Sequence, residues 1–101
     1  MATLTKVAET GDIPPDSAKV VEVAGKTLAL FNAGGTFYAI DNTCLHRGGP
    51  LGEGDLEGTT VTCPWHGWRY DVTTGANVLN PALRVSCYPV RVEGTGVFVE
   101  A

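Results

Sequence analysis

The chain has 101 residues, of which 44% are hydrophobic and 18% charged, and its formal net charge at pH 7 is −4. This length suits a single domain over residues 1–101 and excludes two separate cores. The acidic balance argues against nucleic-acid binding, and the apolar stretches are too short for a transmembrane span. Met1–Lys6 lacks the basic and apolar regions of a signal peptide, so we expect a cytoplasmic protein.

The order of short apolar segments predicts strands. Thirteen glycines and six prolines divide the chain into brief runs, which favours strands over helices. The expected strands lie at 19–23, 26–31, 36–40, 59–62, 88–92 and 97–100. Asn32–Gly35 and Glu93–Gly96 are typical of hairpin turns, and Pro14–Ala18 is expected to form one helical turn. The predicted fold class is therefore all-β, an antiparallel β-sandwich or barrel.

Two motifs, Cys44-Leu45-His46 and Cys63-Pro64-Trp65-His66, contain both histidines and two of the three cysteines. His46 and Cys63 are separated by 16 residues. A zinc finger places its two cysteines together and its two histidines together, whereas thiol and imidazole alternate here. A catalytic Cys–His pair would not need the second copy of the pattern. The arrangement favours an iron–sulfur site.

This C-x-H and C-x-x-H pattern, followed by Arg47-Gly48 in the first motif and by Gly67-Trp68-Arg69-Tyr70-Asp71 in the second, resembles the Rieske domain of ring-hydroxylating oxygenase systems. The resemblance implies one [2Fe–2S] cluster, with Cys44 and Cys63 on one iron and His46 and His66 on the other. It also implies a Rieske-type antiparallel β-sandwich with a cluster-binding subdomain inserted at about residues 41–81. The remainder would form a basal β-domain.

The charge of this ligand set explains the use of both residue types. Two ferric ions and two sulfides leave a charge of +2, which two thiolates cancel and two neutral imidazoles leave unchanged. A cluster with four thiolates is already anionic before reduction, so adding an electron costs more. Histidine ligation therefore raises the reduction potential, from about −400 mV to roughly −150 to +300 mV.

The sequence lacks the residues that an oxygenase or a nucleotide-binding reductase would need. Outside His46 and His66 the chain has no histidine for the mononuclear iron site of an oxygenase, and it has no Gly-x-Gly-x-x-Gly nucleotide motif. We expect a soluble, monomeric one-electron carrier rather than an enzyme. The resemblance implies transient partners: an NAD(P)H-dependent flavin reductase as donor and a Rieske non-haem iron oxygenase as acceptor.

Two other functions stay open at this stage. One is a small Rieske-like subunit of an assimilatory nitrite reductase, which would be isolated in a tight complex with its large subunit. The other is a redox-sensing module, which would not deliver electrons to an oxygenase.

Several residues outside the ligand set have candidate roles. The glycines near the ligands are expected to donate N–H groups to the sulfides, and these are Gly48, Gly49, Gly52 and Gly67. Asn80–Ala82 resembles the proline-containing loop that covers the cluster in related proteins. An apolar docking tip is expected from Pro64, Trp65 and Leu51.

The roles of three acidic residues and of the third cysteine are less clearly indicated by the sequence. The acids Glu53, Asp55 and Glu57 form either a solvated loop or a collar that attracts a basic partner. The third cysteine, Cys87, is expected to be a small buried apolar residue.

Overall fold

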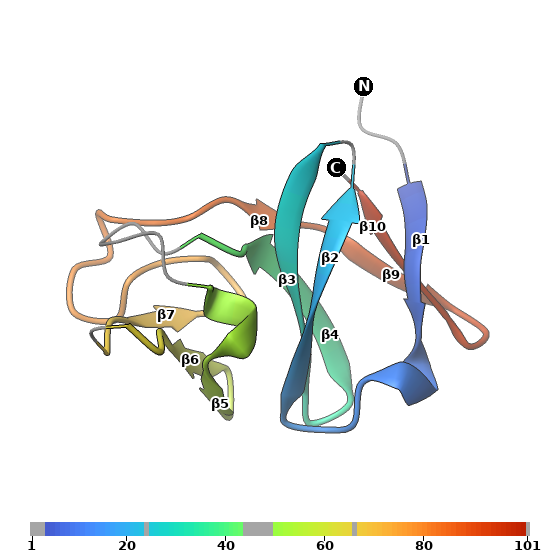
Figure 1. Ribbon diagram of the computed structural model, residues 1–101, viewed down its shortest axis with the longest axis horizontal. Coiled ribbons are helices and arrows are strands. Elements are labelled where there is room, and N and C mark those ends of the chain that lie inside the picture. Colours follow the sequence, from blue (N-terminus) through green and yellow to red (C-terminus); the bar gives the residue numbers. More distant parts are fainter. Residues whose placement is uncertain (1–3, 24, 44–49, 66, 101) are drawn as a thin grey trace.

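The computed structural model describes residues 4–23, 25–43, 50–65 and 67–100, which form ten strands in three antiparallel sheets (Figure 1). This confirms the expected all-β fold class. Within these residues, no helix has the length and apolar character needed to cross a membrane.

A four-stranded sheet lies at the centre, in the order β2-β3-β4-β8. Its strands are β2 (Ser17–Val23), β3 (Lys26–Ala33), β4 (Thr36–Asp41) and β8 (Cys87–Tyr88). The β3–β4 hairpin confirms the turn expected at Asn32–Gly35, because Ala33 pairs with Thr36 and Gly34 and Gly35 both have positive φ angles.

Two three-stranded sheets accompany the central sheet. The first, in the order β1-β10-β9, contains β1 (Leu4–Glu9), β9 (Val90–Glu93) and β10 (Gly96–Glu100). The second, in the order β5-β6-β7, contains β5 (Asp55–Glu57), β6 (Thr60–Thr62) and β7 (Arg69–Asp71). Two short 3₁₀ helices complete the described elements, η1 (Thr10–Asp12) and η2 (Leu51–Glu53).

Strand β3 is buried on both faces, which explains its continuous apolar sequence. Leu28 and Leu30 pack in one cluster with residues of β1, β2, β4 and β10. Ala29 and Phe31 point to the opposite face, as alternation along a strand requires, and pack in a second cluster with residues of β6, β7 and η2. The central sheet therefore has a hydrophobic core on each side.

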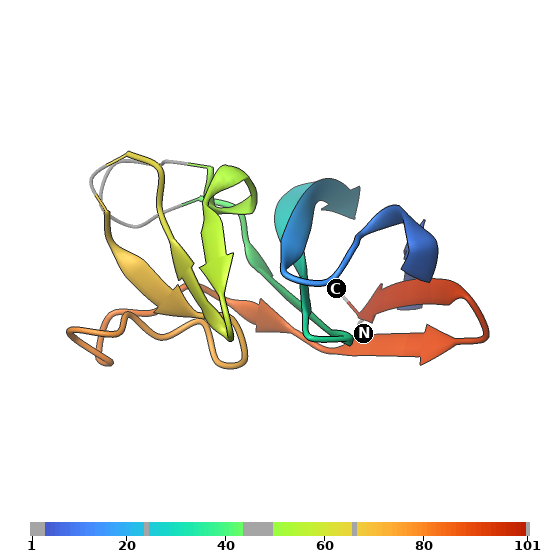
Figure 2. The ribbon, with the colours of Figure 1, turned by 90° about the horizontal axis from the view of Figure 1, so that it is seen from below.

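The β5-β6-β7 sheet belongs to a segment that leaves the central sheet after Asp41 and returns at Cys87. In Figure 2 this sheet and η2 lie at one end of the molecule, and the β1-β10-β9 sheet lies at the other. The segment thus forms a distinct structural layer at one end of the central sheet.

The helical turn expected at Pro14–Ala18 is absent from the described residues. Asp16 has a φ of 63° and its backbone N–H donates to the carbonyl of Asn32 at 2.7 Å. The next two residues already belong to β2. Pairing with β3 therefore overrides the local turn preference.

Candidate metal centre

The second motif begins where β6 ends and lies on the connection to β7. The backbone N–H of Cys63 donates to the carbonyl of Trp68 at 2.7 Å, and the N–H of Gly67 donates to the carbonyl of Cys63 at 3.2 Å. Gly67 has a φ of 74°, a left-handed conformation that glycine adopts at little cost. Two backbone hydrogen bonds therefore close a compact loop at the candidate ligand Cys63. The other ligand of this motif, His66, lies outside the described residues.

The first motif contains Cys44 and His46, which also lie outside the described residues. The chain on either side is described, and Thr43 and Pro50 form an antiparallel bridge across the segment. Asn42 strengthens this closure, because its carbonyl accepts the N–H of Leu51 and its side-chain Oδ1 accepts the N–H of Gly52, both at 2.7 Å. Hydrogen bonds thus join the two described ends of the segment that contains the first motif.

A shared hydrophobic cluster brings the bases of the two loops together. Leu51 follows the first motif and is fully buried, while Cys63 has 3% of its surface exposed. Both pack in one cluster with Ile40, the penultimate residue of β4, and with Tyr70 in the middle of β7. Residues 12 positions apart in sequence, Leu51 and Cys63, are therefore held in one core.

The buried environment of Cys63 suits a thiolate that is bound to a metal ion. A thiolate in an apolar environment is unfavourable unless a positive charge compensates it, and a coordinated metal ion supplies that charge and removes the thiol proton. Among the described residues there is no cluster of three or more His, Cys, Asp or Glu side chains suited to a metal. This agrees with a ligand set of which three members lie outside those residues.

Comparison with known proteins decides the family. The model of the Rieske [2Fe-2S] domain matches residues 3–89. This chain belongs to the Rieske family. The cofactor of the domain is one [2Fe–2S] cluster.

Relatives of this Rieske chain include ferredoxins of dioxygenase systems. The ferredoxin component of a naphthalene 1,2-dioxygenase system from Pseudomonas aeruginosa is 39% identical over 90 residues, which cover 88% of this chain and 86% of the relative. The solved ferredoxin of carbazole 1,9a-dioxygenase from Nocardioides aromaticivorans IC177 superposes with a TM-score of 0.90 at 33% identity, covering 96% of each chain. A chain of a solved complex of reduced oxygenase and oxidised ferredoxin in carbazole 1,9a-dioxygenase superposes with a TM-score of 0.88 at 32% identity, covering 96% of this chain and 92% of that chain.

Two glycines of the Rieske loops have a different role from the one expected. The N–H groups of Gly52 and Gly67 donate to Asn42 Oδ1 and to the carbonyl of Cys63, so they serve the loops themselves. A Cβ on Gly52 would lie 2.6 Å from Cγ2 of Val20, so this position also needs glycine for close packing. Gly48 and Gly49 lie outside the described residues.

The apolar surface near the Rieske loops also differs from the expectation. Leu51 is fully buried and cannot belong to a docking tip, because η2 turns it into the core below the loops. Pro64 is exposed, and Trp65 has 49% of its surface exposed, as expected. Leu79, which the sequence analysis did not single out, has 88% exposed.

Leu79 immediately precedes the Asn80–Ala82 loop, and both lie near the residues that follow the second motif. A groove of about 490 Å³ lies here and is lined by Gly67, Trp68, Arg69, Asn77, Leu79, Asn80 and Leu83. The buried side chain of Asn77 accepts the N–H groups of Leu79 and Asn80 at 2.9 and 3.0 Å. The loop is therefore fixed in a conformation that exposes Leu79 beside the second motif.

The acids Glu53, Asp55 and Glu57 are all exposed, in η2 and along the edge strand β5. Their exposure fits both a solvated edge and a surface that attracts a basic partner. Charged residues on an edge strand also discourage pairing with another chain.

Cys87 is exposed rather than buried, so the expectation of a buried apolar residue was wrong. It pairs with Ile40 at the margin of the central sheet, and its thiol lies 3.6 Å from the carbonyl of Thr73. Cys63 and Cys87 form no disulfide with each other or with another described residue.

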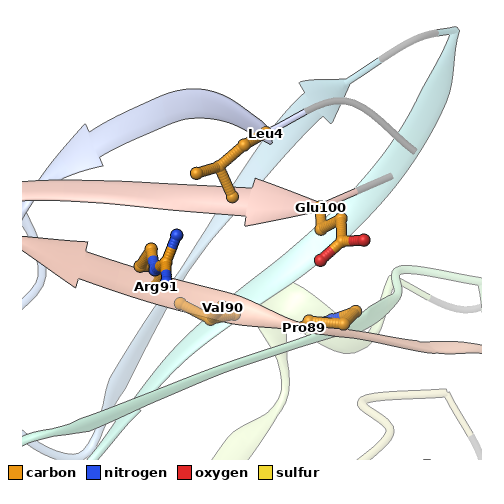
Figure 3. A pocket seen from close by; sticks show the side chains of 5 residues that line it. All are labelled: Leu4, Pro89, Val90, Arg91 and Glu100. Atoms are coloured by element: carbon orange, nitrogen blue, oxygen red, sulfur yellow. The ribbon is translucent and has the colours of Figure 1, made fainter. Parts of the chain in front are cut away.

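A separate hollow of about 340 Å³ lies on the β1-β10-β9 sheet and is lined by Leu4, Pro89, Val90, Arg91 and Glu100 (Figure 3). Arg91 and Glu100 come from the neighbouring strands β9 and β10. The lining residues include no cysteine or histidine. This hollow is therefore not part of the metal centre.

Proposed function

We propose that this Rieske chain is a one-electron carrier that accepts electrons from an NAD(P)H-dependent flavin reductase and passes them to a Rieske non-haem iron oxygenase. The observation that carries the proposal is the superposition of nearly the whole chain on a ferredoxin of a dioxygenase. The naphthalene relative is likewise named as a ferredoxin component. Because a nicotinamide cofactor supplies the electrons, we place the protein in the cytoplasm.

The proposed ligands are Cys44 and Cys63 on one iron and His46 and His66 on the other. The closed loop at Cys63 and the bridged base of the first motif support this assignment. When bound, the cluster supplies one-electron redox chemistry. The residues of the chain hold the two loops in place and exclude water from the buried side of Cys63.

We also propose that residues 1–101 form one domain with a cluster-binding subdomain at about residues 41–81. The β5-β6-β7 sheet and η2 fall inside this range, and both strands that adjoin it, β4 and β8, belong to the central sheet. The second hydrophobic cluster supports a single folding unit, because it contains residues of the central sheet and of the inserted segment.

The exposed side chains of Trp65 and Leu79 are the proposed contact with the electron acceptor. Trp65 belongs to the second motif, and Leu79 belongs to the loop that Asn77 fixes. An electron-transfer contact is typically small, with less than about 1,200 Å² buried in total. A few exposed apolar side chains close to the redox centre are suited to such a transient complex.

A reconstituted electron-transfer chain tests the proposed function. The purified protein should contain about two irons and two sulfides per chain and should be reduced by NADH in the presence of the reductase of a naphthalene or carbazole dioxygenase system. The reduced protein should then deliver one electron per chain to the oxygenase of the same system. One zinc per chain and no sulfide would overturn the ligand assignment, and a reducible cluster that transfers no electron to either oxygenase would overturn the carrier function.

A further inference from the structure

Three hydrogen bonds join Asp41, the last residue of β4, to the strand that returns to the central sheet. The backbone N–H of Asp41 donates to the carbonyl of Ser86 at 2.9 Å. Its carboxylate accepts the N–H of Ser86 at Oδ2, at 3.1 Å, and the hydroxyl of Tyr88 at Oδ1, at 2.8 Å. Both carboxylate oxygens are therefore used to hold one short segment, Ser86–Tyr88.

The same returning segment is joined on its other side to the turn that follows β7. The N–H of Val85 donates to the carbonyl of Gly75 at 2.9 Å, and the thiol of Cys87 lies 3.6 Å from the carbonyl of Thr73. The N–H of Gly75 in turn donates to the carbonyl of Asp71, the last residue of β7, at 2.7 Å. Val85–Tyr88 thus connects β4 with the hairpin that contains Cys63.

These contacts link the two proposed ligand loops by a short path. Asp41 precedes the first candidate ligand, Cys44, by three residues, and Asn42 and Thr43 fix the base of that loop. The second loop is the connection between β6 and β7. A segment that is bonded both to the end of β4 and to the turn after β7 therefore links the described bases of the two loops.

From this arrangement we infer that Asp41 is a positioning residue, which sets the place of the first ligand loop relative to the second through Ser86 and Tyr88. The inference rests on the proposed ligand set. Hydrogen bonds to an ionised acceptor are stronger than those between neutral groups. A carboxylate is needed because donors face both of its oxygens, and an amide would present its own N–H groups to one of them.

Three single variants test the inference in the cluster-loaded protein. Asp41→Asn replaces one acceptor oxygen by a donor, and Tyr88→Phe removes only the hydroxyl. Tyr38→Phe is the matched control, because Tyr38 also lies on β4 and its hydroxyl makes no hydrogen bond with another described residue. The measurements are the electron paramagnetic resonance spectrum of the reduced protein, the rate of iron release to a chelator and the thermal midpoint.

We expect Asp41→Asn to release iron about tenfold faster than the wild type and to show shifted or broadened g values. Tyr88→Phe should show a smaller change in the same direction, and Tyr38→Phe should match the wild type. If Asp41→Asn does not fold, Tyr88→Phe carries the comparison. Spectra and release rates equal to those of the control, with or without a lower thermal midpoint, would overturn the inference. A wild-type protein without a [2Fe–2S] signal would instead overturn the proposed ligand set.

Discussion

The backbone N–H of Cys63 donates to the carbonyl of Trp68 at 2.7 Å, so these two residues close the loop that contains the second motif. This bond extends the β6–β7 ladder by one step beyond the pair Thr62 and Arg69. The hairpin therefore fixes the backbone of Cys63, the proposed ligand at the start of this connection, through a hydrogen bond of its own ladder.

Replacing Cys63 by serine should abolish the cluster, because a hydroxyl is a much weaker ligand for iron than a thiolate. The iron content should fall from about two per chain to nearly zero. The thermal midpoint should fall as well, since metal binding and folding of the loops are coupled. Iron and sulfide analysis with a thermal melt measures both effects.

Cys87→Ser is the control for this variant, because Cys87 is exposed and lies on β8. It should retain the iron and sulfide content of the wild type. A cluster lost from Cys87→Ser, or retained in full by Cys63→Ser, would contradict the proposed ligand set.

Gly75 should be among the most sensitive glycines of the described chain. Its φ is 80°, and a Cβ at this position would lie 2.3 Å from the carbonyl oxygen of Val85. Gly75→Ala should therefore lower the free energy of unfolding by about 3 kcal/mol, from the left-handed backbone and the clash together. Chemical denaturation of the cluster-loaded protein measures the difference.

Gly94 provides the matched control in the β9–β10 turn. Its φ is 63°, but nothing lies within 4 Å of an added Cβ. Gly94→Ala should cost only the conformational part, about 1 kcal/mol. Equal effects at the two positions would show that the contact between Gly75 and Val85 contributes nothing.

Local patterns were sufficient for the hairpins, whereas tertiary packing decided the elements that the sequence analysis missed. The β3–β4 and β9–β10 turns contain glycines with positive φ between apolar strands, and both were predicted. Strand β1 was missed because a bulge between Lys6 and Ala8 interrupts its alternation. Strand β5 was missed because it has three residues and just one partly buried side chain, Leu56.

In the candidate site, too, local features could be predicted from the sequence and features that depend on tertiary packing could not. The ligand motifs could be recognised because their chemistry is local to each motif. The burial of Leu51 and the exposure of Leu79 and Cys87 depend on how η2 and the returning segment pack against the central sheet. These tertiary contacts produce no periodic pattern in the sequence, so they could not be predicted from it.

Leu79→Ser should weaken electron transfer to the oxygenase without changing the redox centre. The side chain is 88% exposed, so the substitution should leave the stability nearly unchanged. Loss of one apolar anchor at a small interface should lower the second-order rate of oxygenase reduction about tenfold. Stopped-flow mixing of the reduced ferredoxin with the oxygenase measures this rate.

Val92→Ser is the matched control, because Val92 is 46% exposed on β9 in the sheet at the other end of the molecule. Its transfer rate should equal that of the wild type. A Leu79→Ser protein as fast as this control would exclude Leu79 from the docking surface. If the midpoint potential of Leu79→Ser differs from that of the wild type, the slower electron transfer is due to a change at the cluster and not to weaker docking.

The contact between Tyr88 and Asp41 should make stability depend on pH in alkaline solution. Burial raises the pKa of Tyr88 above its usual value by desolvating the phenolate, and the hydrogen bond to Asp41 and the charge of its carboxylate raise the pKa further. The unfolded chain therefore releases this proton at a lower pH than the folded protein, at a pKa of about 10. The stabilisation is fully present below that pH and is lost as the pH rises through the folded pKa.

Denaturant titrations between pH 8 and 11 should show a stability that decreases with pH in the wild type, as linkage of proton release to unfolding requires. Tyr88→Phe should remove this contribution and give a shallower decrease. The difference between the wild type and Tyr88→Phe isolates the contribution of Tyr88 from that of the other groups that titrate in this range. An alkaline slope in Tyr88→Phe equal to that of the wild type would mean that the phenol is not held in its protonated form by Asp41.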